Sequence, residues 1–128
     1  MIVDTSIMVA VSLGESTLDW IVQSIGDAGH HPLRMSWANI AEAAIILSRE
    51  NALASDSLEE ILNRMGIETL ESDFAVTRLV AEARLHFPIN FGDCFAYAHA
   101  KLRGEPLITL DADFLKTDLP RVLHPDAP

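Results

Sequence analysis

Residues Pro106–Leu110 read PLITL and are followed directly by Asp111, and residues Met1–Val3 read MIV and are followed by Asp4. A short apolar run bounded by polar residues is typical of a buried strand. Parallel strands bring their carboxyl ends to the same edge of a sheet, and ligand sites of open α/β sheets form at that edge. If these two strands are parallel, both aspartates lie at one edge.

Segments with helical periodicity lie between the short apolar runs. Leu18, Ile21, Val22 and Ile25 recur at the spacing of one helix face. The predicted helices are Thr17–Ala28, Trp37–Arg49, Ser57–Met65, Phe74–Leu85 and Asp93–Arg103. The predicted strands are Met1–Val3, Leu33–Met35, Ile67–Leu70 and Pro106–Leu110, with Arg121–Leu123 as an edge strand. Strands that alternate with helices predict an α/β sandwich around a parallel sheet.

The composition fits a single folded domain. The chain has 128 residues, of which 49% are apolar and 22% are charged, and this excludes intrinsic disorder. We expect one domain over residues 1–124 and a short tail over 125–128. A single cysteine, Cys94, forms no intramolecular disulfide, and neither a signal peptide nor an apolar run of membrane-spanning length is present. These features predict a cytoplasmic protein without a membrane segment.

The charge is strongly negative. Nine Lys and Arg against 19 Asp and Glu give a formal net charge of −10, and the sequence pI is about 4.7. General nucleic-acid binding proteins carry a basic surface instead. Either nucleic acid is not the partner, or the acidic groups act on it specifically.

Glu42 is the most unusual acidic residue. On a helix its neighbours include Asn39, Ile45 and Ile46, so its face is nearly apolar. A buried carboxylate is costly unless it is paired or binds a metal. Glu42 is therefore a metal ligand, or a residue at the rim, or a residue that pairs with Arg34 or Arg49.

Four aspartates taken one at a time have ordinary explanations as caps or turn residues: Asp4, Asp93, Asp111 and Asp113. Gathered in one pocket they would repel each other, by about 3 kcal/mol for a pair 5 Å apart at an effective dielectric of 20. A divalent cation would offset this repulsion. Oxygen ligands without His or Cys favour Mg²⁺ or Mn²⁺ over Zn²⁺.

The acidic motifs resemble those of a known family. They are IVDTS at residues 2–6, ANIAE at 38–42, FGDCFAYA at 91–98 and LITLDADF at 107–114, followed by Thr117 and Asp118. Their order and spacing resemble the PIN-domain family, and specifically the VapC-type toxins of bacterial toxin–antitoxin pairs. The resemblance runs from residue 2 to about residue 123. Over residues 50–85 the arrangement of helices matches the family better than any sequence motif does.

The resemblance implies a three-layer α/β/α sandwich with a short, mainly parallel central sheet. It also implies a Mg²⁺-dependent endoribonuclease, with Mn²⁺ as a substitute, that leaves 5′-phosphate and 3′-hydroxyl ends. The family's catalytic carboxylates map onto Asp4, Glu42, Asp93 and Asp111, which with Asp113 form the expected metal site. Many relatives have Gly-x-Asp-Phe where this chain has Asp111-Ala112-Asp113-Phe114, so the choice between Asp111 and Asp113 stays open, with Asp111 favoured. Thr5, Ser6 and Thr109 are expected as supporting residues. A hydroxyl at Thr5 or Ser6 would hold a metal-bound water or a phosphate oxygen, or else would fix the Asp4 loop by hydrogen bonding.

The resemblance also implies partners. These are an RNA substrate, a VapB-type antitoxin whose C-terminal segment lies across the site, and a second copy in a homodimer. Candidate RNA contacts are Arg49, Lys101, Arg103 and Lys116, each of which otherwise lies on a solvated face. The apolar groups of Trp37–Arg49 and Ser57–Met65 are either contact surfaces or plain core.

Three alternatives remain open. One is a PIN nuclease that processes RNA without an antitoxin, and another is a PIN-like binding module without catalysis. A receiver-type signalling module fits poorly, because strand 33–35 ends at Ser36 and not at an acidic residue. If the five predicted metal-site acids are set aside, 14 acids face 9 bases and the net charge is −5. We therefore expect RNA binding to be local and metal-dependent.

Overall fold

Five short parallel strands form the centre of the molecule. The computed structural model describes residues 1–50 and 56–128. In this part of the chain the strands are β1 (Ile2–Val3), β2 (Arg34–Ser36), β3 (Glu68–Leu70), β4 (Leu107–Ile108) and β5 (Val122–Leu123). Their order is β3-β2-β1-β4-β5, and every neighbouring pair is parallel. All carboxyl ends therefore lie at one edge, as predicted, and β5 is the predicted edge strand.

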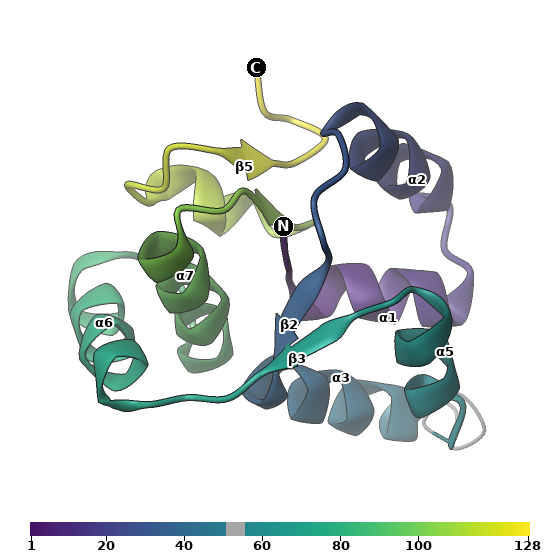
Figure 1. The fold of residues 1–128 in the computed structure, drawn as a ribbon, viewed down its shortest axis with the longest axis horizontal. Helices are drawn as coiled ribbons and strands as arrows, with labels where there is room; N and C mark the ends of the chain where they lie inside the picture. Colours follow the sequence, from purple (N-terminus) through teal and green to yellow (C-terminus); the bar gives the residue numbers. More distant parts are fainter. Residues whose placement is uncertain (51–55) are drawn as a thin grey trace.

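Helices cover both faces of the sheet (Figure 1). They are α1 (Thr5–Leu13), α2 (Leu18–Asp27), α3 (Trp37–Glu50), α5 (Leu58–Arg64), α6 (Phe74–His86) and α7 (Phe91–Arg103), with the short 3₁₀ helix η1 (Ala112–Lys116) after β4. Ile2 and Leu107 pack toward the core beneath α6 and α7, whereas Val3 and Ile108 pack toward the core beneath α1 and α3. This alternation follows from the two-residue period of a strand. The predicted three-layer sandwich is confirmed.

Helix α1 was missing from the sequence-based prediction. Six of its nine residues, TSIMVAVSL, are apolar, and Ile7, Met8 and Ala10 are fully buried. A helix without a polar face has no periodic contrast to reveal it. It begins directly after β1, with Asp4 as its N-cap, and ends at Gly14 with φ +63°. This tight β1–α1 turn fixes the position of Asp4.

The apolar groups of the two helices named as candidate surfaces divide between core and solvent. In α5, Leu58 and Leu62 are buried in the core. In α3, Ile40 and Leu47 are buried, but Ile45 is exposed. Trp37, the first residue of α3, is also about half exposed. The α5 residues are therefore core, and α3 presents an apolar face to solvent.

Helix α7 begins at Phe91, two residues before the predicted start at Asp93. Asn90 is its N-cap, and the Asn90 side chain accepts a hydrogen bond from the Asp93 backbone N–H at 2.9 Å. The Asp93 side chain in turn accepts one from the Asn90 N–H at 3.3 Å. This reciprocal capping box places Asp93 inside the first turn.

A charge network joins strands at the amino edge of the sheet, opposite the aspartates. Glu105 accepts hydrogen bonds from the Met1 amino group at 2.8 Å, from Arg34 at 2.7 Å and from Arg103 at 2.9 Å. Although burial alone would raise the pKa of Glu105, these three donors hold it at about 2. The network fastens β1, β2 and the start of β4 together.

The tail predicted over 125–128 is a turn next to His124, whose ring accepts from the Asp126 N–H at 3.0 Å. Across residues 1–50 and 56–128, no helix combines the length and the hydropathy that a membrane crossing requires.

Candidate active site

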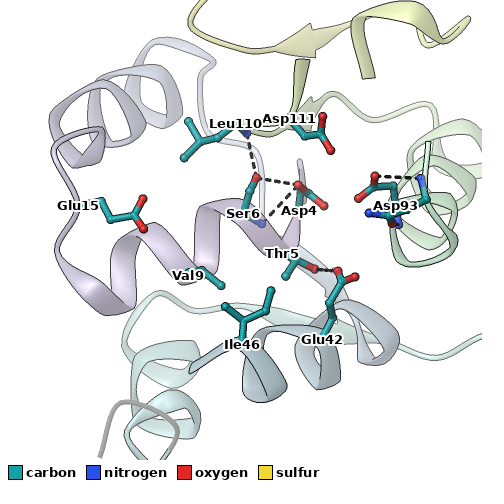
Figure 2. Close-up of a pocket in the computed structure, with 11 residues that line it drawn as sticks. Asp4, Thr5, Ser6, Val9, Glu15, Glu42, Ile46, Asp93, Leu110 and Asp111 are labelled. Atoms are coloured by element: carbon teal, nitrogen blue, oxygen red, sulfur yellow. Dashed lines mark hydrogen bonds between the residues drawn. The ribbon is translucent and has the colours of Figure 1, made fainter. Parts of the chain in front are cut away.

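A pocket of about 340 Å³ lies where β1 and β4 end and α3 and α7 pass by (Figure 2). Among the residues that the structure describes, five carboxylates line it: Asp4, Glu15, Glu42, Asp93 and Asp111. No Lys, Arg, His or Cys among those residues is part of its wall. Every ionisable group in the described wall is therefore acidic, as the motif spacing predicts.

Asp4 lies deepest in the pocket, with 1% of its surface exposed. Its Oδ2 accepts hydrogen bonds from the Ser6 hydroxyl at 2.7 Å and from the Thr109 hydroxyl at 2.9 Å. Its Oδ1 is buried and has no hydrogen-bond partner among the residues that the structure describes. Burial raises the pKa of Asp4, and the bonds to Ser6 and Thr109 offset only part of that effect. The hydrogen bonds to Oδ2 therefore fix the orientation of the Asp4 carboxylate. No hydrogen-bond donor of the described residues compensates the negative charge at Oδ1.

Ser6 and Thr109 connect β1 to β4 behind the carboxylate. The Ser6 hydroxyl accepts a hydrogen bond from the Leu110 N–H at 2.9 Å, and the Thr109 hydroxyl accepts one from the Asp111 N–H at 2.9 Å. The same two hydroxyls donate to Asp4. They therefore fix both aspartates through one short network.

Glu42 comes from α3 and faces Thr5, which donates a short hydrogen bond to Glu42 Oε1. Neither Arg34 nor Arg49 forms an ion pair with it in the described part of the chain, so the alternative in which Glu42 pairs with one of those arginines is wrong. The Glu42 carboxylate occupies the space that a Cβ at Gly92 would take. Asn39, buried beside it, donates to the Gly92 carbonyl at 2.9 Å and holds α3 close to α7.

Asp93 is buried at the first turn of α7. Burial is the largest cause of its raised pKa, and the negative charges of Asp4, Asp111 and Glu42 raise it further, to about 7. The hydrogen bond with Asn90 acts in the opposite direction but is weaker. The raised pKa of Asp93 thus reflects its burial first and the negative charge of the neighbouring carboxylates second.

Asp111 and Asp113 point to different places. Asp111 lines the pocket and caps η1, accepting from the Asp113 N–H at 2.9 Å. Asp113 does not line the pocket, and its carboxylate pairs with Lys116 at 2.7 Å. Of the two aspartates whose roles the sequence left open, Asp111 therefore faces the other carboxylates.

The donor set fits a hard divalent cation. All candidate ligands are oxygen atoms, and the orphaned Asp4 Oδ1 is a buried acceptor that a cation would satisfy. In the described residues, no three Asp, Glu, His or Cys side chains stand close enough to enclose an ion as they are placed. Glu42 is held by Thr5 and Asp93 by Asn90, so these carboxylates must turn toward the ion to share it.

Sequence reasoning missed three polar residues at the site. Asn90 had a signal, because Asn-x-x-Asp before an apolar run matches a capping box with Asp in the place of Glu. Asn39 had none, since a buried Asn cannot be distinguished from an exposed one by spacing. Glu15 follows Gly14 at the end of α1, and it was missed because α1 itself was missed.

The four candidate RNA-binding cations all lie outside the pocket wall. Three are paired with acids: Lys101 with Asp118, Arg103 with Glu105, and Lys116 with Asp113. Arg49 lines a neighbouring hollow and forms no ion pair with any residue that the structure describes. It is therefore the one of these four whose charge is not matched by an acid in the described structure.

Comparison with known proteins identifies the family. Residues 1–119 match the sequence profile of the PIN domain. Ribonuclease VapC36 of Mycobacterium tuberculosis is 35% identical over 127 residues, which cover 93% of this chain and 91% of VapC36. Ribonuclease VapC42 of the same species is 32% identical over 128 residues, which cover 93% of this chain and 96% of VapC42.

Solved structures share the fold. VapBC2 from Rickettsia felis, bound to a DNA fragment from its promoter, superposes with a TM-score of 0.75 at 16% identity and covers 96% of both chains. VapC20 of M. tuberculosis, a Sarcin-Ricin loop cleaving toxin, superposes with a TM-score of 0.72 at 18% identity and covers 89% of this chain and 92% of VapC20. Together with the sequence matches, this excludes the receiver-type alternative. The chain belongs to the PIN domain family, among the VapC ribonucleases.

Proposed function

We propose that this protein is a VapC-type endoribonuclease that hydrolyses RNA phosphodiester bonds with Mg²⁺, for which Mn²⁺ can substitute. One observation carries the proposal. Four carboxylates from separate parts of the chain, Asp4, Glu42, Asp93 and Asp111, converge on one pocket, and the deepest of them has an unsatisfied buried oxygen. We assign the metal to these four residues and leave Asp113 outside, because Lys116 neutralises it.

Mg²⁺ held there would supply positive charge to the scissile phosphate and acidify a water near it. The residues of the chain do the rest. Ser6 and Thr109 orient Asp4, Thr5 positions Glu42, and Asn90 positions Asp93. The pocket carboxylates accept the proton of the attacking water. Since the described wall carries no His, Lys or Cys, cleavage through a Cys or Lys nucleophile or through a His acid–base pair has no candidate group there.

Single substitutions in the pocket test the assignment. Asp4→Asn, Asp93→Asn and Asp111→Asn should each lower Mg²⁺-dependent cleavage of purified cellular RNA by roughly 100-fold or more. Glu60→Gln is the matched control, because Glu60 is an exposed acid paired with Arg64 on α5. Circular dichroism confirms that each variant is folded. If all three Asn variants cleave like the control, the site assignment is wrong.

We further propose that a VapB-type antitoxin silences the enzyme by placing a basic segment in the pocket. The pocket is acidic, and the chain carries a net charge of −10, so an Arg or Lys of a partner is electrostatically complementary. Co-purification of the product of a small neighbouring reading frame, with release by high salt and loss of cleavage in the complex, tests this. A chain with no such neighbour would instead match the RNA-processing alternative.

We also propose a homodimer with one nuclease domain per chain over residues 1–124, located in the cytoplasm. The resemblance of the chain to VapC-type toxins, a family for which a homodimer is expected, supports this proposal. Light scattering after size-exclusion chromatography should give twice the 14.1 kDa chain mass. A mass of one chain at micromolar concentration would reject the dimer.

A further inference from the structure

A second hollow opens beside the carboxylate pocket, between α3 and α7. It encloses about 440 Å³ and is lined mainly by apolar side chains, among them Ala41 and Ile45 of α3 and Phe91 and Phe95 of α7. Glu42 and Ile46 line both this hollow and the carboxylate pocket. We call it the α3–α7 groove. If one phosphate of an RNA strand lies in the pocket, the adjoining nucleotide would therefore lie in the groove.

Phe91 forms an exposed aromatic wall of the groove. Its side chain is 66% exposed, and its ring packs edge-to-face on Phe95 with the centroids 5.2 Å apart. Phe95 thus supports Phe91 from within the protein. Aromatic side chains displayed in this way bind unstacked RNA bases, and this contact tolerates different sequences because every base has a flat face.

Arg49 supplies a free cation at the same groove. Arg49 lines the groove and has no acidic partner in the described structure, unlike Lys101, Arg103 and Lys116. A guanidinium group binds phosphate oxygens with two donors. An apolar wall with an unpaired cation selects a ligand that is flat and apolar but also anionic, and a nucleotide has both properties.

We propose that the α3–α7 groove is a nucleotide subsite, in which a base next to the scissile phosphate stacks on Phe91 while Arg49 contacts the adjoining phosphate. The proposal rests on the ribonuclease function proposed above. It explains how a molecule with a net charge of −10 retains RNA. Without a basic surface, affinity must come from base contacts close to the pocket.

Charge separates this occupant from two others. A basic antitoxin segment would fit the carboxylate pocket and Glu42, where the groove adjoins that pocket, but Arg49, two helical turns further along α3, repels it in the rest of the groove. A second copy of the chain would bring further negative charge, yet it offers no reason for an aromatic wall that adjoins the catalytic carboxylates. The nucleotide uses both features of the groove at once.

Binding of short single-stranded RNA tests the proposal. The probes are a fluorescein-labelled 12-nucleotide oligoadenylate and an abasic ribose-phosphate 12-mer of equal charge, each with Mg²⁺ and with intactness checked on a gel. Wild-type protein should bind the oligoadenylate more tightly than the abasic probe. Phe91→Ala should weaken oligoadenylate binding by roughly 5- to 100-fold, the range for loss of one base–aromatic stack, and leave the abasic probe unchanged. Phe91→Tyr should retain wild-type binding.

Phe74→Ala is the matched control, since Phe74 is an 80% exposed Phe that lines neither the groove nor the pocket. Thermal unfolding of each variant shows whether it is folded, and Phe91→Leu replaces Phe91→Ala if the latter is not. Arg49→Gln should weaken both probes.

Equal binding of the two probes by wild-type protein, or unchanged oligoadenylate binding by Phe91→Ala, overturns the proposal. If Phe91→Ala instead loses dimer mass or antitoxin capture with RNA binding intact, the groove belongs to that partner and the proposal is likewise overturned. None of these overturning results contradicts the proposed ribonuclease function. Absence of RNA cleavage by wild-type protein would reject the ribonuclease function without contradicting base-specific binding in the groove.

Discussion

At the scale of single residues, Asp93 should link the proposed metal binding to pH. Burial and the neighbouring carboxylates raise its pKa to about 7 in the metal-free protein, whereas an unfolded Asp titrates near 3.9. Between these values the unfolded chain has lost the proton that the folded chain still holds. The free energy of unfolding therefore falls as pH rises from about 4 to about 7, by up to about 4 kcal/mol from this group.

Asp93→Asn removes this titration and keeps the acceptor for the Asn90 N–H. In EDTA, the melting temperature of Asp93→Asn should exceed that of wild type at pH 8, and the two should converge toward pH 4.5. In wild type, Mg²⁺ should raise the melting temperature more at pH 8 than at pH 5, because the ion displaces the proton. A difference between variant and wild type that does not change with pH would show that Asp93 titrates normally.

Gly92 is the residue that leaves room for Glu42. A Cβ at this position would overlap the Glu42 carboxylate, so Gly92→Ala forces that side chain out of place. We expect cleavage to fall by roughly 100-fold, the cost of displacing a catalytic group by about 1 Å. Gly26→Ala on α2 is the control, because its Cβ would meet nothing within 4 Å. Equal activity of the two variants would show that the position of Glu42 tolerates the methyl group.

At the scale of elements, the β1–α1 turn combines a helix cap with a buried carboxylate. Asn is as good an N-cap as Asp, whereas Ala removes the cap at a cost of about 1 kcal/mol. Asp4→Asn should therefore stabilise the metal-free protein, by about 1–3 kcal/mol, because it removes an uncompensated buried charge. Asp4→Ala should stabilise it less.

Urea denaturation in EDTA and in Mg²⁺ measures both effects. Neither variant should gain stability from Mg²⁺, in contrast to wild type. Mg²⁺ stabilisation of Asp4→Asn equal to that of wild type would show that Asp4 is a cap and not a ligand.

The opposite edge of the sheet is stabilised by Glu105. Its folded-state pKa of about 2 lies below the unfolded value, so its contribution is present above about pH 4.5 and is lost as pH falls toward 2. Glu105→Gln should cost roughly 3 kcal/mol at pH 7 and much less at pH 2.5, as measured by urea denaturation. Glu60→Gln, which breaks an exposed pair on one helix, should cost under about 0.5 kcal/mol at either pH. A Glu105→Gln cost independent of pH would mean that packing, not charge, accounts for it.

At the scale of the molecule, the charge of −10 predicts how RNA is held. Few phosphates can be contacted, so the logarithm of the affinity should fall with the logarithm of the salt concentration with a slope no steeper than about −2. Binding should also weaken strongly in EDTA. Fluorescence anisotropy of a labelled 12-mer across a salt series at fixed Mg²⁺ measures both. Tight binding in EDTA, or a slope near −5, would indicate a basic surface that the described structure lacks.

The sequence predicts most of this architecture because strands and helices alternate with clear periodicity, and because each acidic motif lies in or directly after a recognisable element. Two kinds of feature could not be predicted from the sequence. Helix α1 is buried on nearly every side and has no polar face, so its periodicity is hidden, and Glu15 was lost with it. The choice between Asp111 and Asp113 depends on the turn of η1 and on Lys116, which only the three-dimensional arrangement reveals.

We propose that the carboxylate pocket, and no other group of the chain, carries out hydrolysis of RNA with a divalent cation. The chemistry of the RNA ends tests this most directly. Purified wild-type protein is incubated with cellular RNA and Mg²⁺, and the new ends are mapped beside parallel reactions with EDTA and with Asp93→Asn. We predict new 5′-phosphate and 3′-hydroxyl ends with wild-type protein and Mg²⁺ alone. New 5′-hydroxyl ends with cyclic phosphates, formed equally in EDTA or by Asp93→Asn, would contradict the account.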